Sequence, residues 1–274
     1  MLISDSLVSS DSRWAQAARA GRRLGHTVEF HPSLPSTNDR ARALLAETGG
    51  DGTVVVADLQ TAGRGRRGRQ WLSPPGANLL MSVALRPRNV PVERGAWIGA
   101  AAALSVVAAN AGSMPLRIRW PNDVVAPDGL KVAGLLVETA AVGEMLTEAI
   151  IGIGINVNWR RAEMPPEIAP QATSLAEQAG LSMDRVTVLA RLLDELDAAV
   201  GQVEAGVSPM SDYAAASMLT GSSVEVDLGD RRLNGLVAGV DDTGALILDT
   251  DDGRVALTVG EVVRVRPAGD RIHG

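Results

Sequence analysis

The sequence predicts two units of different character, a larger domain of helices and strands and a small all-β barrel behind it. Between residues 36 and 219, segments with helical periodicity alternate with short apolar strands. From residue 221 onward, short strands are separated by turns rich in Asp and Gly, which is typical of a small barrel. We therefore assign residues 1–219 to the larger domain and residues 220–268 to the barrel.

The composition is that of a globular protein. The chain has 274 residues, and 46% of them are hydrophobic, which is enough for a buried core. It contains no cysteine and three scattered histidines, so disulfides and cysteine-ligated zinc are excluded and no metal-binding residues are expected. The start lacks the pattern of a signal peptide, and no apolar run of spanning length is free of glycine and charge. We expect a cytoplasmic protein that does not enter a membrane.

The first predicted elements are two helices. Residues 13–24 favour one short basic helix, which leaves no room for a helix-turn-helix module, so no DNA binding is expected. Residues 36–47 favour a second helix, which opens with Ser36, Thr37 and Asn38. Three polar side chains exceed what one helix cap requires. They are either a cap or a helix N-terminus that faces a ligand.

A loop rich in glycine and arginine, residues 60–71, separates two predicted buried strands at residues 53–58 and 78–85. The loop holds four arginines in a chain whose formal net charge is −6. Glycine lets the backbone approach a ligand closely, and arginine suits phosphate or carboxylate oxygens. We interpret the loop as a flap that orders over an anionic ligand, with Trp71 as an apolar lid. The alternative is a solvated basic loop.

The chain has a single lysine, Lys131, among 26 basic residues. Lysine is a compact ammonium on a thin stem and can reach into a tight pocket where arginine cannot. Residues 116–120 and 131–138 predict two strands joined by a turn at 127–129, which would bring Asp123 close to Lys131. Apolar neighbours would partly desolvate the lysine, so we expect an anionic partner, either Asp123 or a ligand phosphate.

Two further segments are predicted to form the centre of the larger domain. Residues 95–110 favour an alanine-rich helix that can pack closely on the sheet. Residues 148–158 alternate as a strand, with isoleucines on one face and Gly152, Gly154 and Asn156 on the other. Glycines weaken a strand unless another body lies against its backbone, so this face is either a floor for a flat ligand or a helix contact.

The remaining elements follow from the same patterns. A short helix starts at residue 173, and two longer helices are expected at 184–205 and 208–219. The strands of the barrel are expected at residues 223–228, 233–240, 245–248, 255–259 and 262–265.

Five segments in this order resemble the motifs of the biotin protein ligases: residues 36–38, 60–71, 119–123, 131–138 and 152–156. The resemblance implies an α+β catalytic domain with a mixed β-sheet, like that of class II aminoacyl-tRNA synthetases, and an SH3-like barrel behind it. It implies an ATP-dependent ligase that makes biotinyl-5′-AMP and passes biotin to a lysine of the biotin carboxyl carrier domain of an acyl-CoA carboxylase. ATP and biotin would be substrates, and Mg²⁺ is expected with the ATP phosphates.

The resemblance also implies roles for individual residues. Lys131, Arg64 and Arg66 would offset the repulsion between the biotin carboxylate and ATP, and Asp123 would orient or deprotonate the acceptor amine. The residues expected at the nucleotide are Arg66, Arg67, Arg69, Asn122, Asp123, Lys131 and Asn156. Those expected at biotin are Ser36, Thr37, Asn38, Gln60, Arg64, Gly65, Arg66, Trp71, Lys131, Gly134, Gly152 and Gly154.

Departures and alternatives remain. Arg119 stands where the family often has lysine, and the DNA-binding module of some members is not expected here. A lipoate or octanoate ligase would share the catalytic fold, although the loop and the barrel favour biotin. A non-enzymatic RNA-binding protein could use the arginine loop, but one Tyr and one Phe leave little surface for base stacking. A monomer and a ligand-dependent homodimer are both compatible with the sequence.

Overall fold

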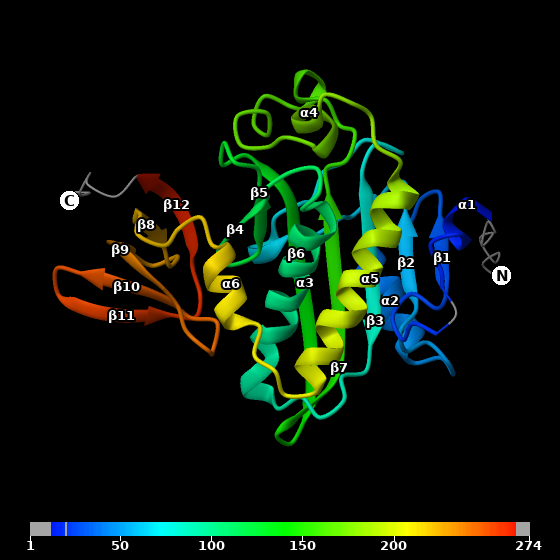
Figure 1. The fold of residues 1–274 in the computed structure, drawn as a ribbon, viewed down its shortest axis with the longest axis horizontal. Helices are drawn as coiled ribbons and strands as arrows, with labels where there is room; N and C mark the ends of the chain where they lie inside the picture. The colour runs from blue at the N-terminus through cyan, green and yellow to red at the C-terminus, as the bar shows by residue number, and fades with distance from the viewer. Residues whose placement is uncertain (1–11, 20, 267–274) are drawn as a thin grey trace.

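The computed structural model describes residues 12–19 and 21–266, which form a seven-stranded mixed sheet with helices and then a five-stranded antiparallel sheet (Figure 1). The larger sheet has the order β1-β2-β3-β7-β6-β5-β4, and only β1 and β2 pair in parallel. The predicted α+β class with a mixed sheet is confirmed. The strands are β1 (Val28–His31), β2 (Val54–Ala57), β3 (Leu79–Leu85), β4 (Arg117–Arg119), β5 (Asp123–Val125), β6 (Lys131–Val142) and β7 (Met145–Ile155).

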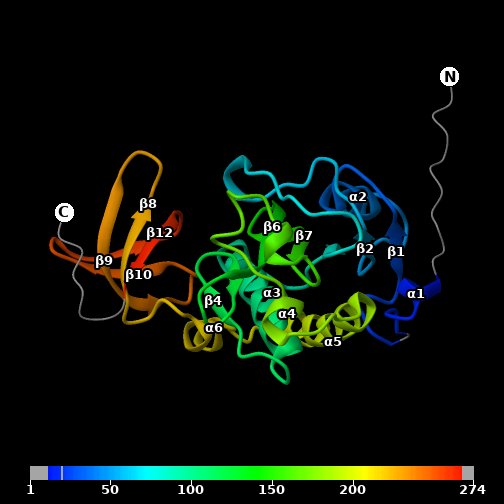
Figure 2. The ribbon, with the colours of Figure 1, turned by 90° about the horizontal axis from the view of Figure 1, so that it is seen from above.

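The helices cover both faces of this sheet. Figure 2 shows α2 on one side and α3 and α5 on the other. Short 3-10 turns occur at Arg66–Gly68, Val92–Arg94 and Arg161–Glu163. The helices are α1 (Ser12–Ala15), α2 (Thr37–Leu45), α3 (Gly95–Asn110), α4 (Leu175–Ala179), α5 (Arg185–Glu204) and α6 (Met210–Ala216).

Helix α3 has the bounds predicted from its alanine content. Its small side chains let it pack closely against α5 and against the sheet, where it contacts β6. The stretch Val92–Asn110 has the length and hydropathy of a membrane span, yet most of the apolar side chains of α3 belong to the main hydrophobic core or pack against it. Its apolar character is therefore explained by burial inside the protein.

The predicted helix over residues 13–24 is wrong beyond its first turn, because α1 ends at Ala15. Gly21 and Gly25 have positive φ values of 95° and 79°, a backbone conformation that ends a right-handed helix. The chain is instead fixed to α5, where Arg22 Nε donates to Asp194 Oδ1 over 2.8 Å. A tertiary ion pair and two glycines therefore override the local helical pattern.

Two short strands were missed, and one of them changes the predicted pairing. β1 is a parallel neighbour of β2, and its four residues are too few for a clear pattern. β5 lies between β4 and β6, so the predicted hairpin of residues 116–120 with 131–138 is wrong. Each of these strands pairs with β5 instead. The turn at 127–129 joins β5 to β6, and the proximity of Asp123 to Lys131 survives the correction.

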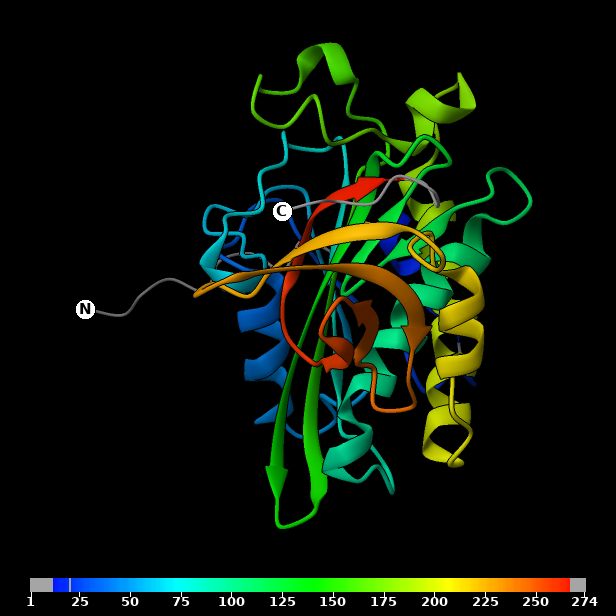
Figure 3. The same ribbon diagram turned by 90° about the vertical axis from the view of Figure 1, so that its left-hand side faces the viewer.

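All five strands predicted for the second unit are present, and they form one curled antiparallel sheet in the order β11-β10-β9-β8-β12 (Figure 3). Indole N–H groups attach it to the larger domain: Trp97 donates to Asp242 O over 2.7 Å and Trp120 to Gly244 O over 3.0 Å. The division after residue 219 and the SH3-like class stay predictions. The strands are β8 (Ser223–Asp227), β9 (Arg232–Val240), β10 (Leu246–Thr250), β11 (Gly253–Leu257) and β12 (Glu261–Arg266).

We expect Leu193→Ala to lower the free energy of unfolding by about 2–5 kcal/mol, because it removes a buried side chain and leaves a cavity. Leu193 lies on α5 and is 0% exposed. Urea unfolding followed by circular dichroism measures the change. The matched control is Glu195→Ala on the exposed face of α5, which should change stability by less than about 0.5 kcal/mol. Equal losses in the two variants would contradict the packing of α5.

Candidate functional site

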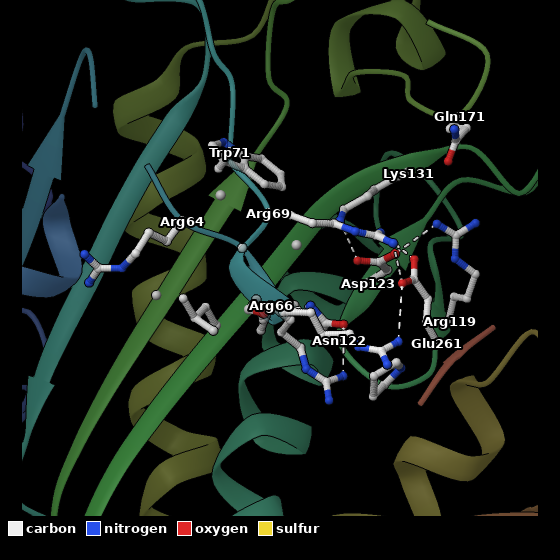
Figure 4. A pocket seen from close by; sticks show the side chains of 18 of the residues that line it. Arg64, Arg66, Arg69, Trp71, Arg119, Asn122, Asp123, Lys131, Gln171 and Glu261 are labelled. Carbon is white, nitrogen blue, oxygen red and sulfur yellow. Dashed lines mark hydrogen bonds and ion pairs between the residues drawn. The ribbon is translucent and has the colours of Figure 1, made fainter. Parts of the chain in front are cut away.

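A cavity of about 710 Å³ lies where the arginine loop, the glycine face of the large sheet and strand β12 meet (Figure 4). Asn156 is the one predicted site residue that does not line it. The predicted residues that do are Ser36, Thr37, Asn38, Gln60, Arg64, Gly65, Arg66, Arg67, Arg69, Trp71, Asn122, Asp123, Lys131, Gly134, Gly152 and Gly154.

Lys131 is held in this cavity by two neighbours. Its Nζ lies 2.6 Å from Asp123 Oδ1 and 5.3 Å from the ring centroid of Trp71. The other carboxylate oxygen of Asp123 accepts from Arg119 Nη2 over 2.9 Å. The Lys131 side chain is 28% exposed, so a counter-ion is needed, and in this structure Asp123 supplies it.

The arginine loop forms a tight turn whose ends are bonded to each other. Gly65 N–H donates to Arg69 O over 2.7 Å, and Trp71 N–H donates to Gly63 O over 3.0 Å. Arg67 takes a positive φ of 56° at the tip, which few residues other than glycine adopt. The loop therefore has a defined shape in this structure, and its predicted mobility stays a prediction.

The loop arginines are paired with acidic side chains of the protein itself. Arg64 Nη1 donates to Asp39 Oδ2 over 2.8 Å, and this contact lowers the pKa of Asp39. Arg67 and Arg69 both contact the carboxylate of Glu261 on β12. In Figure 4 the guanidinium of Arg64 points away from Lys131. The positive charge of the loop is thus largely neutralised without a ligand.

Arg66 differs from the other three arginines. Its guanidinium donates to the amide oxygen of Asn122 over 3.4 Å, and no carboxylate contact is found for it among the described residues. Burial, and after it the charge of Arg67, lowers the pKa of Arg66. A half-buried guanidinium with no carboxylate contact among the described residues, lining the same cavity as Lys131 and Asp123, is a good position for an anionic ligand.

The glycine face of β7 is not bare, which corrects the prediction of an open floor. The alternation itself is confirmed, because Ile151, Ile153 and Ile155 are in the core. A Cβ placed on Gly154 would lie 2.6 Å from the Trp71 ring, and one on Gly134 would lie 2.8 Å from it. A Cβ on Gly152 would meet the side-chain amide of Asn38. The glycines therefore make room for the protein's own side chains.

Trp71 is consequently both a wall of the cavity and a cover over two glycines. Its indole N–H is buried and has no hydrogen-bond partner within the part of the chain that the structure describes. A buried N–H without a partner costs free energy, so a ligand that offers an acceptor to it would bind more favourably.

The start of α2 is bonded to the loop instead of being capped by its own side chain. Ser36 makes no side-chain cap hydrogen bond. Gln60 Oε1 accepts from the N–H of Thr37 over 2.8 Å and from its hydroxyl over 3.0 Å. The helix N-terminus is thus fixed to the residue that begins the loop, which favours the ligand-facing interpretation over the cap.

Sequence reasoning missed three residues that hold the site together. Ser82 is fully buried and bonds both Thr37 and Asn38. Its signal was a lone hydroxyl in the otherwise apolar strand β3. Glu138 bonds Asn38 from β6, and Glu261 bonds the loop from the second sheet. Glu138 ends the segment 131–138, but the sequence gives no sign of the contact that either acidic residue makes, because their partners are about 100 and 190 residues away.

Asn156 lies behind the cavity wall. Its side chain is 4% exposed, and its amide nitrogen donates to Thr173 O over 3.0 Å. The backbone N–H of Asn156 donates to Val132 O over 2.8 Å. It therefore secures the segment before α4 against β6, and its predicted contact with a nucleotide has no support in this geometry.

Residues 30–156 match the sequence model of the biotin/lipoate A/B protein ligase family, and residues 220–265 match the biotin protein ligase C-terminal domain. A biotin–[acetyl-CoA-carboxylase] ligase of Mycobacterium tuberculosis is 34% identical over 96% of this chain and 94% of its own length. A bifunctional ligase/repressor of Escherichia coli is 34% identical over 90% of this chain and 77% of its own length.

The fold agrees with these matches. A biotin protein ligase from Aquifex aeolicus, solved in complex with biotin and ATP, superposes with a TM-score of 0.74 at 31% identity. The superposition covers 88% of this chain and 99% of the Aquifex chain. Together with the matched motifs around the cavity, these likenesses show that the chain belongs to the biotin protein ligase family.

Proposed function

We propose that this protein activates biotin with ATP to biotinyl-5′-AMP and transfers the biotinyl group to a lysine of a biotin carboxyl carrier domain of an acyl-CoA carboxylase. The observation that carries the proposal is that Lys131 and Arg66 line one cavity, and that Arg66 has no carboxylate contact among the described residues. Glycines and Trp71 line the same cavity. The ligands of the Aquifex aeolicus relative, biotin and ATP, support the same pair of substrates here. The cell compartment that we propose is the cytoplasm.

In the first step a biotin carboxylate oxygen attacks the α-phosphorus of ATP, and the bond to pyrophosphate breaks. Two anions must approach each other, so mutual repulsion opposes the reaction. Lys131 would turn from Asp123 to the two reacting anions, while Arg119 keeps the charge of Asp123 compensated. Arg66 would bind phosphate oxygens, because no carboxylate among the described residues competes for it.

In the second step a carrier lysine amine attacks the carbonyl carbon of the mixed anhydride, and AMP leaves. The amine must lose a proton, and Asp123 is the carboxylate beside Lys131 that would accept or orient it. Trp71 and the loop would exclude water, which otherwise hydrolyses the anhydride. This role for the loop follows from its position over the glycine face.

Mg²⁺ would be brought by ATP. Among residues 12–19 and 21–266, no group of three or more His, Cys, Asp or Glu side chains could hold a metal ion. Mg²⁺ commonly uses substrate phosphates and water as ligands, so the residues fit an ion that arrives with the nucleotide.

We expect Lys131→Ala to lower the rate of biotin-dependent pyrophosphate exchange by about 100-fold or more, the range for loss of one electrostatic contact to the reacting atoms. Radioactive pyrophosphate incorporation into ATP measures the rate. The control, Arg191→Ala, removes an exposed cation on α5 and should keep the full rate. A wild-type rate in Lys131→Ala would exclude this mechanism. Exchange driven by lipoate instead of biotin would identify the alternative ligase.

The backbone amides of residues 63–69 should exchange hydrogen more slowly once biotin and ATP are added. In the free protein only part of this backbone is bonded, and the ligand would contact the loop amides and guanidinium groups. Hydrogen–deuterium exchange mass spectrometry measures the protection, with the amides of β10 as internal reference. Unchanged exchange in the loop would contradict its role as a flap.

Gly154→Ala should weaken biotin binding by about 1–3 kcal/mol, because the new methyl group displaces the Trp71 ring. Calorimetry measures the dissociation constant. Gly201→Ala on α5, where nothing lies within 4 Å of the added methyl group, is the matched control and should be neutral. In a Trp71→Ala background the effect of Gly154→Ala should fall below about 0.5 kcal/mol. An undiminished effect there would mean that Trp71 is not the group displaced.

A further inference from the structure

A continuous row of polar contacts runs from Glu138 on β6 into the cavity. It begins at Glu138 on β6, whose carboxylate accepts from Asn38 Nδ2 over 2.6 Å. Asn38 Oδ1 lies 2.6 Å from the hydroxyl of Ser82, which lies 2.7 Å from the hydroxyl of Thr37. Thr37 in turn donates to Gln60 Oε1 over 3.0 Å. Glu138 is the one member of this row that does not belong to the cavity lining or to the buried core.

The donor and acceptor roles are fixed at both ends of the row. The backbone N–H of Thr37 can only donate, so Gln60 must turn its oxygen toward it, and the Gln60 amide nitrogen is left for other partners. The carboxylate of Glu138 can only accept, so Asn38 must turn its nitrogen outward and its oxygen toward Ser82. Ser82 has a single proton and lies between two acceptors. The acceptor oxygen of Glu138 therefore determines which way the Asn38 amide points in this row.

The surroundings leave the Asn38 amide little freedom to move. Asn38 is 5% exposed, and a Cβ on Gly152 would collide with its Oδ1. The second oxygen of Glu138 lies 3.3 Å from Arg42 Nη2 on α2, which holds the carboxylate in place. Asn38 also lies 3.4 Å from Leu136 O, a second acceptor on the same side. Without Glu138, one weak acceptor would remain to hold the amide nitrogen outward.

We infer that Glu138 is a positioning residue: by orienting Asn38 it sets the donor and acceptor pattern that Asn38, Thr37 and Gln60 present to the ligand. Such a pattern suits a polar ring such as the cyclic urea of biotin, which carries one carbonyl acceptor and two N–H donors. It offers nothing to the apolar dithiolane ring of lipoate. Glu138 thus determines that biotin is bound in preference to lipoate, and this inference rests on the function proposed above.

The test compares Glu138→Ala with the wild type in the pyrophosphate exchange assay. Loss of a hydrogen bond to a charged group should raise the KM for biotin about 10- to 100-fold, with the kcat and the KM for ATP within about twofold. Glu138→Gln keeps an oxygen acceptor and should recover most of the lost affinity. Glu148→Ala, an acidic residue on the neighbouring strand β7, is the matched control and should behave like the wild type.

A ligand comparison separates positioning from general damage. Calorimetry with biotin and with ATP should show that Glu138→Ala binds biotin more weakly than the wild type does and binds ATP equally well. An unchanged KM for biotin, or an equal rise for biotin and ATP, would overturn the inference. No recovery in Glu138→Gln would overturn it as well. Failure of the proposed function has a different signature, because the wild-type protein itself would then show no biotin-dependent exchange.

Discussion

The ion pair between Lys131 and Asp123 is the interaction on which the geometry of the site depends. The Lys131 backbone is bonded on both sides, since its N–H donates to Gln171 O over 2.8 Å and its C=O accepts from Thr173 over 2.9 Å. β5 places Asp123 opposite Gly134, which lies three residues after Lys131 at the start of β6. Burying an ammonium costs less when a carboxylate lies beside it, and the pairing of β5 with β6 supplies that carboxylate, so the strand order and the ion pair are coupled.

Other cations of the cavity are also paired with carboxylates of the protein. Asp39 and Glu261 compensate the loop arginines just as Asp123 compensates Lys131. When an anionic ligand binds to these cations, its anionic groups replace the protein's own carboxylates. The net Coulomb gain is therefore smaller than the number of cations suggests. Selectivity must come from groups with fixed directions, which are the bonded amides and hydroxyls beside the glycine face.

Much of this could be predicted from the sequence because the signals are local. The isoleucine and glycine alternation of β7, the alanine-rich α3, the arginine loop and the lone lysine each lie within one short segment. The misses are tertiary. β5 has three residues, too few for periodicity, and without it the wrong hairpin follows. Trp71 covers Gly134 and Gly154 because of the path that the loop takes. The sequence of the loop does not reveal which strand the loop lies against.

The second sheet also has to be understood as part of the site. The sequence predicts it as an appended unit, yet residues 260–265 line the cavity, and Glu261 bonds Arg69 of the loop. A carboxylate on a separate sheet can hold the loop only if the two sheets keep a fixed relative position. The hydrogen bonds from Trp97 and Trp120 to the turn before β10 provide that attachment. The attachment of the second sheet therefore determines how the arginine loop is held over the cavity.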